Sequence, residues 1–169
     1  MNPFGESSVA MSLAEMDQRH LTAAQGYVEL GMFLDANAEL EKIGADSRHL
    51  PAVLAIRIRV YCALEKWELM LAMARRLALV EPDNPEWKVL WAYAARYCDS
   101  IEAARMIMVN ATADQPQAAV LHFNLAAYEC QLGNLDEATA RLRRAFELDP
   151  KYRLMALEDE DLEPLWASL

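Results

Sequence analysis

The distribution of apolar and polar residues along the chain predicts helices and no strand. Apolar residues make up 54 % of the 169 residues, yet no segment rich in Val, Ile and Thr alternates with polar residues. Ala, Leu, Met and Glu are abundant, and these side chains lose little freedom in a helix. Together with helix-start and turn residues, this pattern predicts eight helices with short connections: 13–30, 35–44, 51–64, 67–80, 85–97, 100–112, 117–132 and 135–147.

A repeat with a period of about 34 residues organises this helical pattern. Pro82, Pro116 and Pro150 are evenly spaced at that period. Ala104 and Ala111 likewise stand one period before Ala138 and Ala145. A period of this length is typical of proteins that stack two-helix units, each of which buries its apolar face against the next unit.

The last unit resembles the tetratricopeptide repeat (TPR) family. Small residues such as Ala138 and Ala145 fall where the family's helices cross, Gly133 falls at the turn, and Pro150 follows the second helix. The resemblance implies four repeats, 17–50, 51–84, 85–118 and 119–152, of which the first two are degenerate. Residues 1–16 are then an N-terminal tail with the start of the first helix, and residues 153–169 a C-terminal cap.

The fold implied by this resemblance is all-α: a right-handed superhelical stack of four helix pairs with a C-terminal capping helix. Leu162, Leu165 and Trp166 supply the apolar side chains that would cover the last repeat. The acidic run 158–161 just ahead of them suits the positive end of a capping helix. The alternative is that this tail docks onto another protein.

In the family, the first helix of each repeat lines a concave groove. Carried over by position, the residues of this chain best suited to bind a peptide there are Arg59, Tyr93, Arg96, Tyr97 and Phe123. Aromatic rings with an arginine alongside are typical of binding hot spots. Two alternatives stay open: the tyrosines pack on neighbouring helices, or the second repeat is slipped by two residues and Arg57 replaces Arg59.

Charge and cysteine usage narrow the function classes. A net charge of −10 has the wrong sign for a nucleic-acid or anionic-membrane partner. Cys62, Cys98 and Cys130 form no CxxC pair and have no histidine at metal-ligand spacing, and no nucleophile motif is present. No segment matches a signal peptide or a membrane span. We therefore expect no catalytic residue, no metal and no cofactor, in a cytoplasmic, bacterial protein.

These observations predict a non-enzymatic scaffold that binds a peptide segment of another protein in the concave groove. An alternative is a secretion-type chaperone for a hydrophobic client, because such chaperones are acidic repeat proteins of similar size. A further alternative, an enzyme using the groove as a substrate channel, would need convergent titratable groups.

Arg75-Arg76 and Arg143-Arg144 recur near the ends of second helices, where the helix dipole favours cations.

Overall fold

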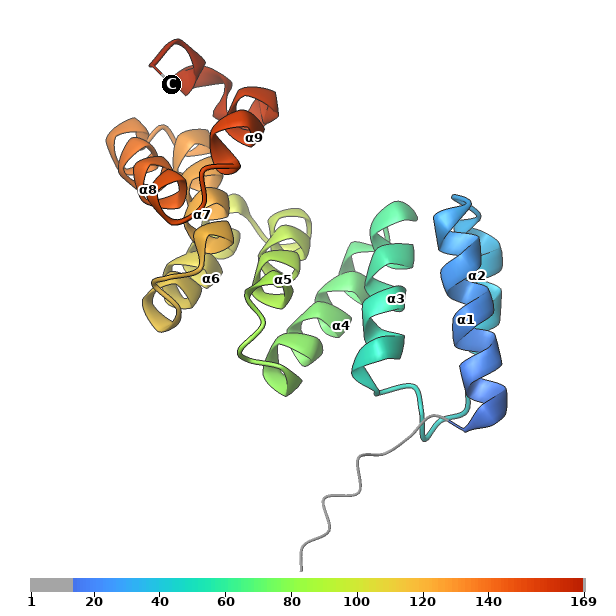
Figure 1. Cartoon of the computed structure of the whole chain (residues 1–169). Helices are drawn as coiled ribbons and strands as arrows, with labels where there is room; N and C mark the ends of the chain where they lie inside the picture. The colour runs from blue at the N-terminus through green and yellow to red at the C-terminus, as the bar shows by residue number, and fades with distance from the viewer. Residues whose placement is uncertain (1–13, 169) are drawn as a thin grey trace, which may run out of the picture.

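The computed structural model describes residues 14–168, and over that range it contains helices and no strand (Figure 1). The α-helices are α1 (Glu15–Glu29), α2 (Phe33–Glu41), α3 (Pro51–Ala63), α4 (Trp67–Val80), α5 (Pro85–Cys98), α6 (Ile101–Asp114), α7 (Ala119–Gln131), α8 (Leu135–Leu148) and α9 (Tyr152–Glu158). A 3-10 helix, η1 (Glu160–Ser168), ends the described chain. Most of the predicted tail, residues 1–13, lies outside the described residues.

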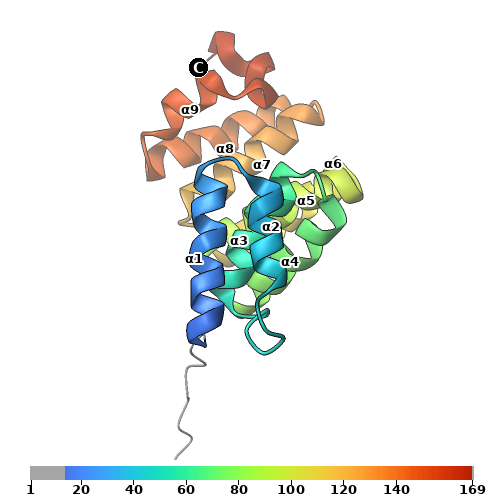
Figure 2. The same cartoon turned by 90° about the vertical axis from the view of Figure 1, so that its right-hand side faces the viewer.

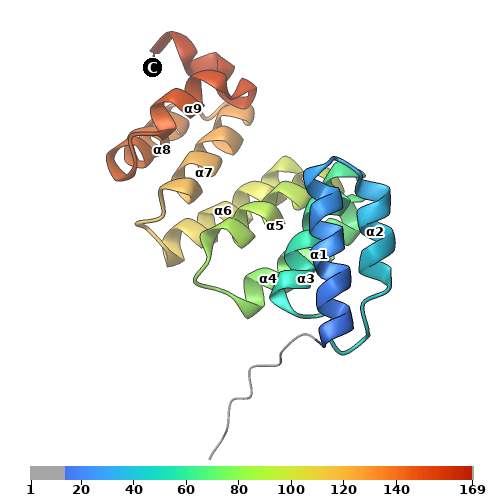
Figure 3. The same cartoon turned by 45° about the vertical axis from the view of Figure 1, so that its right-hand side comes forward.

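The helices form four successive pairs, each packed on the next, and the stack curves (Figures 1 and 3). The second helices begin at Phe33, Trp67, Ile101 and Leu135, which follow one another at the period of the sequence repeat. The predicted all-α stack is confirmed. The second repeat keeps this spacing, so it is not slipped by two residues.

The small residues that we expect at the helix crossings are buried. Ala104, Ala111, Ala138 and Ala145 are all at most 2 % exposed. In the second repeat the equivalent positions hold Met70 and Leu77, and these larger side chains are also fully buried. The core therefore follows the repeat through all of the described pairs, including the degenerate ones.

The turn between the two helices of a repeat recurs with the same backbone geometry. Gly31 and Gly133 have φ of 72° and 79°, and Glu65, at the equivalent position of the second repeat, has φ of 54°. Glycine adopts this left-handed region without cost, whereas a residue with a Cβ does not. The third repeat differs: Asp99 has φ of −117°, and the Ser100 hydroxyl accepts a hydrogen bond from Ala103 N–H at the start of α6.

Helix α2 is shorter than the other second helices. It has nine residues, whereas α4, α6 and α8 have 14 each. The sequence pattern predicts a helix to residue 44, but the helix ends at Glu41. Gly44 N–H instead donates to Asp17 Oδ1 at 2.9 Å, which ties the following loop to α1. A long-range contact thus ends this helix early.

The chain returns to the last repeat after Pro150. Leu162 and Leu165 of η1 are buried in a cluster with apolar residues of α7 and α8. Trp166 is 36 % exposed, and its indole N–H donates to Ala156 O at 2.9 Å. Figure 2 shows α9 and η1 lying across the end of the stack opposite α1. This terminal segment covers the apolar side of the fourth pair.

Cys130 is buried, and Cys62 and Cys98 are half-buried; none of the three forms a disulfide within residues 14–168. No helix in the described range is long and apolar enough to cross a membrane.

Candidate functional site

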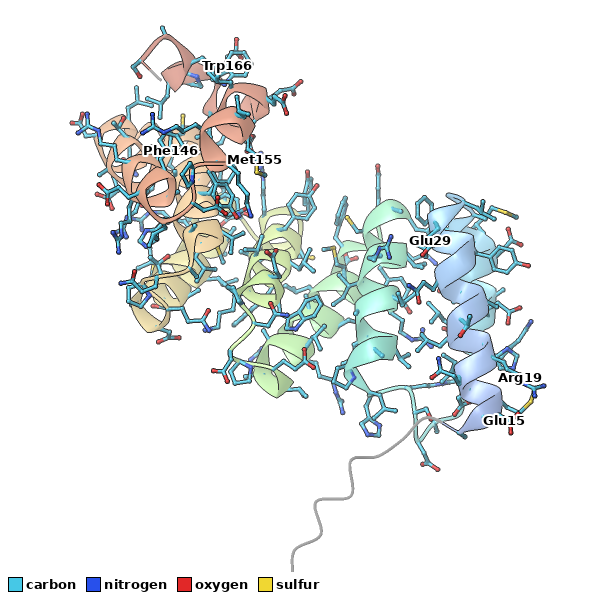
Figure 4. All side chains as sticks on the ribbon, in the orientation of Figure 1. Glu15, Arg19, Glu29, Phe146, Met155 and Trp166 are labelled. Atoms are coloured by element: carbon cyan, nitrogen blue, oxygen red, sulfur yellow. The ribbon has the colours of Figure 1, made fainter. Side chains whose placement is uncertain are left out.

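Four of the five predicted groove residues line one cleft. Tyr93, Arg96 and Tyr97 come from α5 and Phe123 from α7. The opposite wall is Met155 of α9 and the acidic residues that follow it, Glu158, Asp159, Glu160 and Asp161. We call this space of about 530 Å³ the C-terminal cleft. In Figure 4, Met155 points from α9 toward the side on which α5 lies.

An aromatic cluster forms the α5 wall. Tyr97 stacks on Trp67 of α4, with ring centroids 4.2 Å apart and an interplanar angle of 10°. Tyr93 meets both rings edge to face, at 6.0 Å from Trp67 and 5.3 Å from Tyr97. Tyr97 nevertheless remains 49 % exposed. The tyrosines therefore pack on each other and on Trp67 of α4, and Tyr97 also presents part of its ring to solvent.

The two tyrosine hydroxyls lie 3.4 Å apart. This hydrogen bond, together with partial burial, raises the pKa of Tyr93 to about 12. Tyr93 is therefore neutral at physiological pH, and this wall offers its hydroxyl group rather than a phenolate charge.

Phe123 lines the cleft but is almost completely buried. It is only 5 % exposed and packs against Tyr152, with ring centroids 4.9 Å apart. Because Tyr152 begins α9, the return of the chain after Pro150 covers this ring. Phe123 lines the floor of the cleft but belongs to the core, and its truncation would destabilise the last repeat.

Arg96 is paired within the chain. Its guanidinium contacts both carboxylate oxygens of Asp161, with Nη2 to Oδ1 at 3.2 Å. The Asp161 carbonyl also accepts a hydrogen bond from Gln131 of α7 at 3.1 Å. The hydrogen bond to Asp161 raises the pKa of Arg96 further above its usual range. The carboxylate that Arg96 binds is thus supplied by η1 of the same chain.

The wall opposite the tyrosines is acidic. Glu158 and Glu160 are exposed, and neither they nor Asp159 form an ion pair within the described residues. Burial raises the pKa of Asp159, whose carboxylate accepts a hydrogen bond from Asp161 N–H at 3.0 Å. One arginine therefore stands against four carboxyl groups, so the cleft attracts cations.

Arg59, the fifth predicted residue, does not line this cleft. It is exposed on α3, one repeat earlier. Arg57 would take the place of Arg59 if the second repeat were slipped by two residues. It is buried and packs between α2 and α3. The unslipped register therefore leaves Arg59 at the surface and Arg57 in the interior.

Sequence reasoning missed the acidic wall and Trp67. The sequence assigns the acidic run to a helix start, and Glu160, Asp161 and Glu163 do lie in the first turn of η1. That Asp161 also pairs with Arg96 depends on how α9 turns back over α7. Trp67 stacks on Tyr97 because it stands at the start of α4, beside the end of α5.

Comparisons with known proteins were made by sequence and by structure. Neither a scan against protein-family models nor a search of curated proteins finds a match. Solved structures do match. A structure titled MamA MSR-1 C2 aligns with a TM-score of 0.66 and 21 % identity, covering 80 % of this chain and 78 % of that one.

Two TPR proteins align over similar lengths. TTC0263 of Thermus thermophilus gives a TM-score of 0.68 and 21 % identity, covering 90 % of this chain and 82 % of its own. YrrB, described as a TPR protein with an unusual peptide-binding site, gives 0.66 and 18 %, covering 82 % and 71 %. At such identities the likeness establishes the fold, a stack of TPR helix pairs.

Proposed function

We propose that this chain, which has the fold of the tetratricopeptide-repeat proteins, is an interaction scaffold that binds a segment of a partner protein in the C-terminal cleft. The observation that carries the proposal is the gathering of Tyr93, Arg96, Tyr97 and Phe123 in one cleft. Aromatic and arginine side chains at a concave surface are the composition of binding hot spots. The peptide-binding site named for YrrB supports a similar use of a similar stack.

The chemistry of the two walls indicates the kind of segment. The exposed ring of Tyr97 offers area to an apolar or aromatic anchor, and the half-buried Tyr93 adds a hydroxyl. Glu158 and Glu160 face this surface with no ion pair within residues 14–168. We therefore propose a segment that carries a lysine or arginine next to its apolar anchor, because the carboxylates would pair with it.

The ion pair of Arg96 with Asp161 bears on the charge of the partner segment. An acidic partner would have to displace Asp161 from Arg96 before pairing with it. A basic partner needs no such exchange, since three carboxyl groups of the wall are free of ion pairs among the described residues. The sign of the partner's charge therefore distinguishes the two binding modes.

A peptide library tests the proposal directly. Fluorescent peptides that vary an aromatic anchor and an adjacent Lys, Ala or Glu are titrated with the protein, and binding is followed by anisotropy. Tyr97→Ala should weaken the best peptide by about 1 to 3 kcal/mol, which is about 5- to 150-fold. Arg75→Ala on α4 is the matched control, because Arg75 is exposed and does not line the cleft.

The library also separates the alternatives. Preference for Lys-containing peptides, weakened by Glu160→Gln and by added salt, supports the proposed mode. Preference for Glu-containing peptides contradicts it and indicates exchange at Arg96. Binding of unrelated apolar peptides without regard to charge would favour a chaperone for a hydrophobic client.

A further inference from the structure

A second cleft lies where the first repeat meets the second repeat. It is formed by the end of α2, the loop that follows, α3 and α4, and it encloses about 460 Å³. We call it the basic cleft, because three of its polar lining residues are arginines. The polar lining residues are Glu41, Arg48, His49, Arg57, Tyr61 and Arg76. None of these residues belongs to the C-terminal cleft.

The early end of α2 explains why this cleft exists. Helix α4 continues to Val80, and the position one repeat earlier is 46, whereas α2 ends at Glu41. About one and a half turns of helix are therefore missing where a full-length α2 would run beside Arg76. The hydrogen bond from Gly44 N–H to Asp17 Oδ1 ties the loop to α1, and a Cβ at Gly44 would come within 3.3 Å of Asp17 Oδ2. The opening is thus built into the fold.

The deepest cation of the cleft is held rigidly. Arg57 is 6 % exposed, and its Nη1 donates to Glu41 Oε1 at 2.7 Å and to the Tyr61 hydroxyl at 2.9 Å. Its Nη2 donates to Leu40 O at 2.8 Å. These bonds use three of the five N–H groups of the guanidinium. The fork is oriented in advance and retains donors for another acceptor.

Two further donor groups of the basic cleft, on Arg76 and Tyr61, have no acceptor within residues 14–168. Arg76 forms no hydrogen bond or ion pair with any residue in the range 14–168. Tyr61 accepts from Arg57, and its own hydroxyl hydrogen has no acceptor within the same range. Arg48 uses two N–H groups on the carbonyls of Ile43 and Glu41, which positions its guanidinium at the cleft. Glu41 is the sole carboxylate among the lining residues.

We propose that the basic cleft binds a small molecule that carries carboxylate or phosphate groups. Three guanidinium groups stand against one carboxylate there, in a protein whose net charge is −10. Guanidinium forks recognise both oxyanions through paired hydrogen bonds. The volume of the cleft falls in the range that holds small-molecule ligands. The helix dipole explains a cation near the end of α4, but it does not explain three arginines converging from three segments.

Titration calorimetry of the full chain tests this site with two probes, inorganic phosphate and tricarballylate. We expect saturable binding of at least one probe, weakened about tenfold or more by Arg76→Gln. The matched control is Arg75→Gln, its sequence neighbour, which is also exposed but lies over Trp91 and outside the cleft. Because Arg76 has no partner in the described structure, its replacement should leave the melting temperature unchanged.

The two probes and the two variants give distinct outcomes. Binding of phosphate alone or of tricarballylate alone identifies the oxyanion and supports the site. Equal weakening by Arg75→Gln and Arg76→Gln overturns it, because the effect would then be general charge. Absence of binding by both probes also overturns it.

Discussion

Arg96 of α5 and Asp161 of η1, 65 residues apart in sequence, form a two-point ion pair across the C-terminal cleft. The contact joins the third repeat to the segment that covers the fourth. The side chains of Arg96 and Asp161 are 25 % and 30 % exposed, so water partly screens their ion pair. The pair fixes where the acidic wall stands relative to the tyrosines.

Removing the acidic member of that pair should loosen the wall. We expect Asp161→Asn to lower the free energy of unfolding by about 1 kcal/mol, since the pair is only partly buried. Urea denaturation measures the change. Glu163→Gln is the control, because Glu163 is exposed on the same 3-10 helix and forms no ion pair within the described residues. Equal loss in both variants would mean that Arg96 contributes nothing specific.

The helix crossing at Ala138 should resist enlargement. Ala138→Leu forces a larger side chain into a position with no exposed surface, and we expect it to cost about 1 to 3 kcal/mol. Ala140→Leu, an exposed position on the same helix, should change stability by less than about 0.5 kcal/mol. Thermal denaturation of the two variants compares them. A stable Ala138→Leu protein would place the crossing elsewhere.

Glu65 is the one left-handed turn position among 31, 65 and 133 that is not glycine. A Cβ costs roughly 1 to 2 kcal/mol in that region, and the extra freedom of glycine in the unfolded chain offsets part of this. We expect Glu65→Gly to stabilise the protein by about 0.5 to 1 kcal/mol in chemical denaturation. Ala72→Gly, exposed within α4, should instead destabilise by about 1 kcal/mol.

The Glu41–Arg57 pair should make stability depend on acid pH. The hydrogen bond from Arg57 lowers the pKa of Glu41 from its usual 4.5, so the folded state favours the carboxylate. The resulting stabilisation is fully present above about pH 4.5 and is lost as the pH falls through the lowered value. Because Glu41 is half exposed, we expect a contribution on the order of 1 kcal/mol or less.

Comparison with Glu41→Gln isolates that contribution. The variant cannot titrate at this position, so the difference in unfolding free energy between the two proteins should shrink as the pH drops below about 4.5. A difference that stays constant from pH 7 to pH 3 would show that the carboxylate charge is not the source of the stabilisation.

The sequence predicted the fold because the repeat encodes it locally. Pro51 and Pro85 start first helices, and Ala104 and Ala138 mark crossings, so the regular spacing placed each element within a few residues. The end of α2 could not be predicted in this way, since Gly44 is tied to Asp17, 27 residues earlier.

Prediction of the C-terminal cleft was partial for a similar reason. The repeat register placed Tyr93, Arg96 and Tyr97 on one face of α5, and in the structure all three line the same cleft. Burial of Phe123 and pairing of Arg96 depend on Tyr152 and Asp161, which belong to the segment that folds back after Pro150. No periodic signal describes that segment, so its position follows only from tertiary packing.

The shortened α2 also bears on how the stack opens. In a linear array of repeats, each unit is held by its own core and by its contacts with the next unit, and end units open first. The first pair packs on α3 through α1 and the nine-residue α2, whereas each later second helix has 14 residues. Amide hydrogens of α1 and α2 should therefore exchange with solvent before those of α5 and α7. Such opening would dismantle the basic cleft while the C-terminal cleft stayed intact, so mild denaturant should abolish one binding activity before the other.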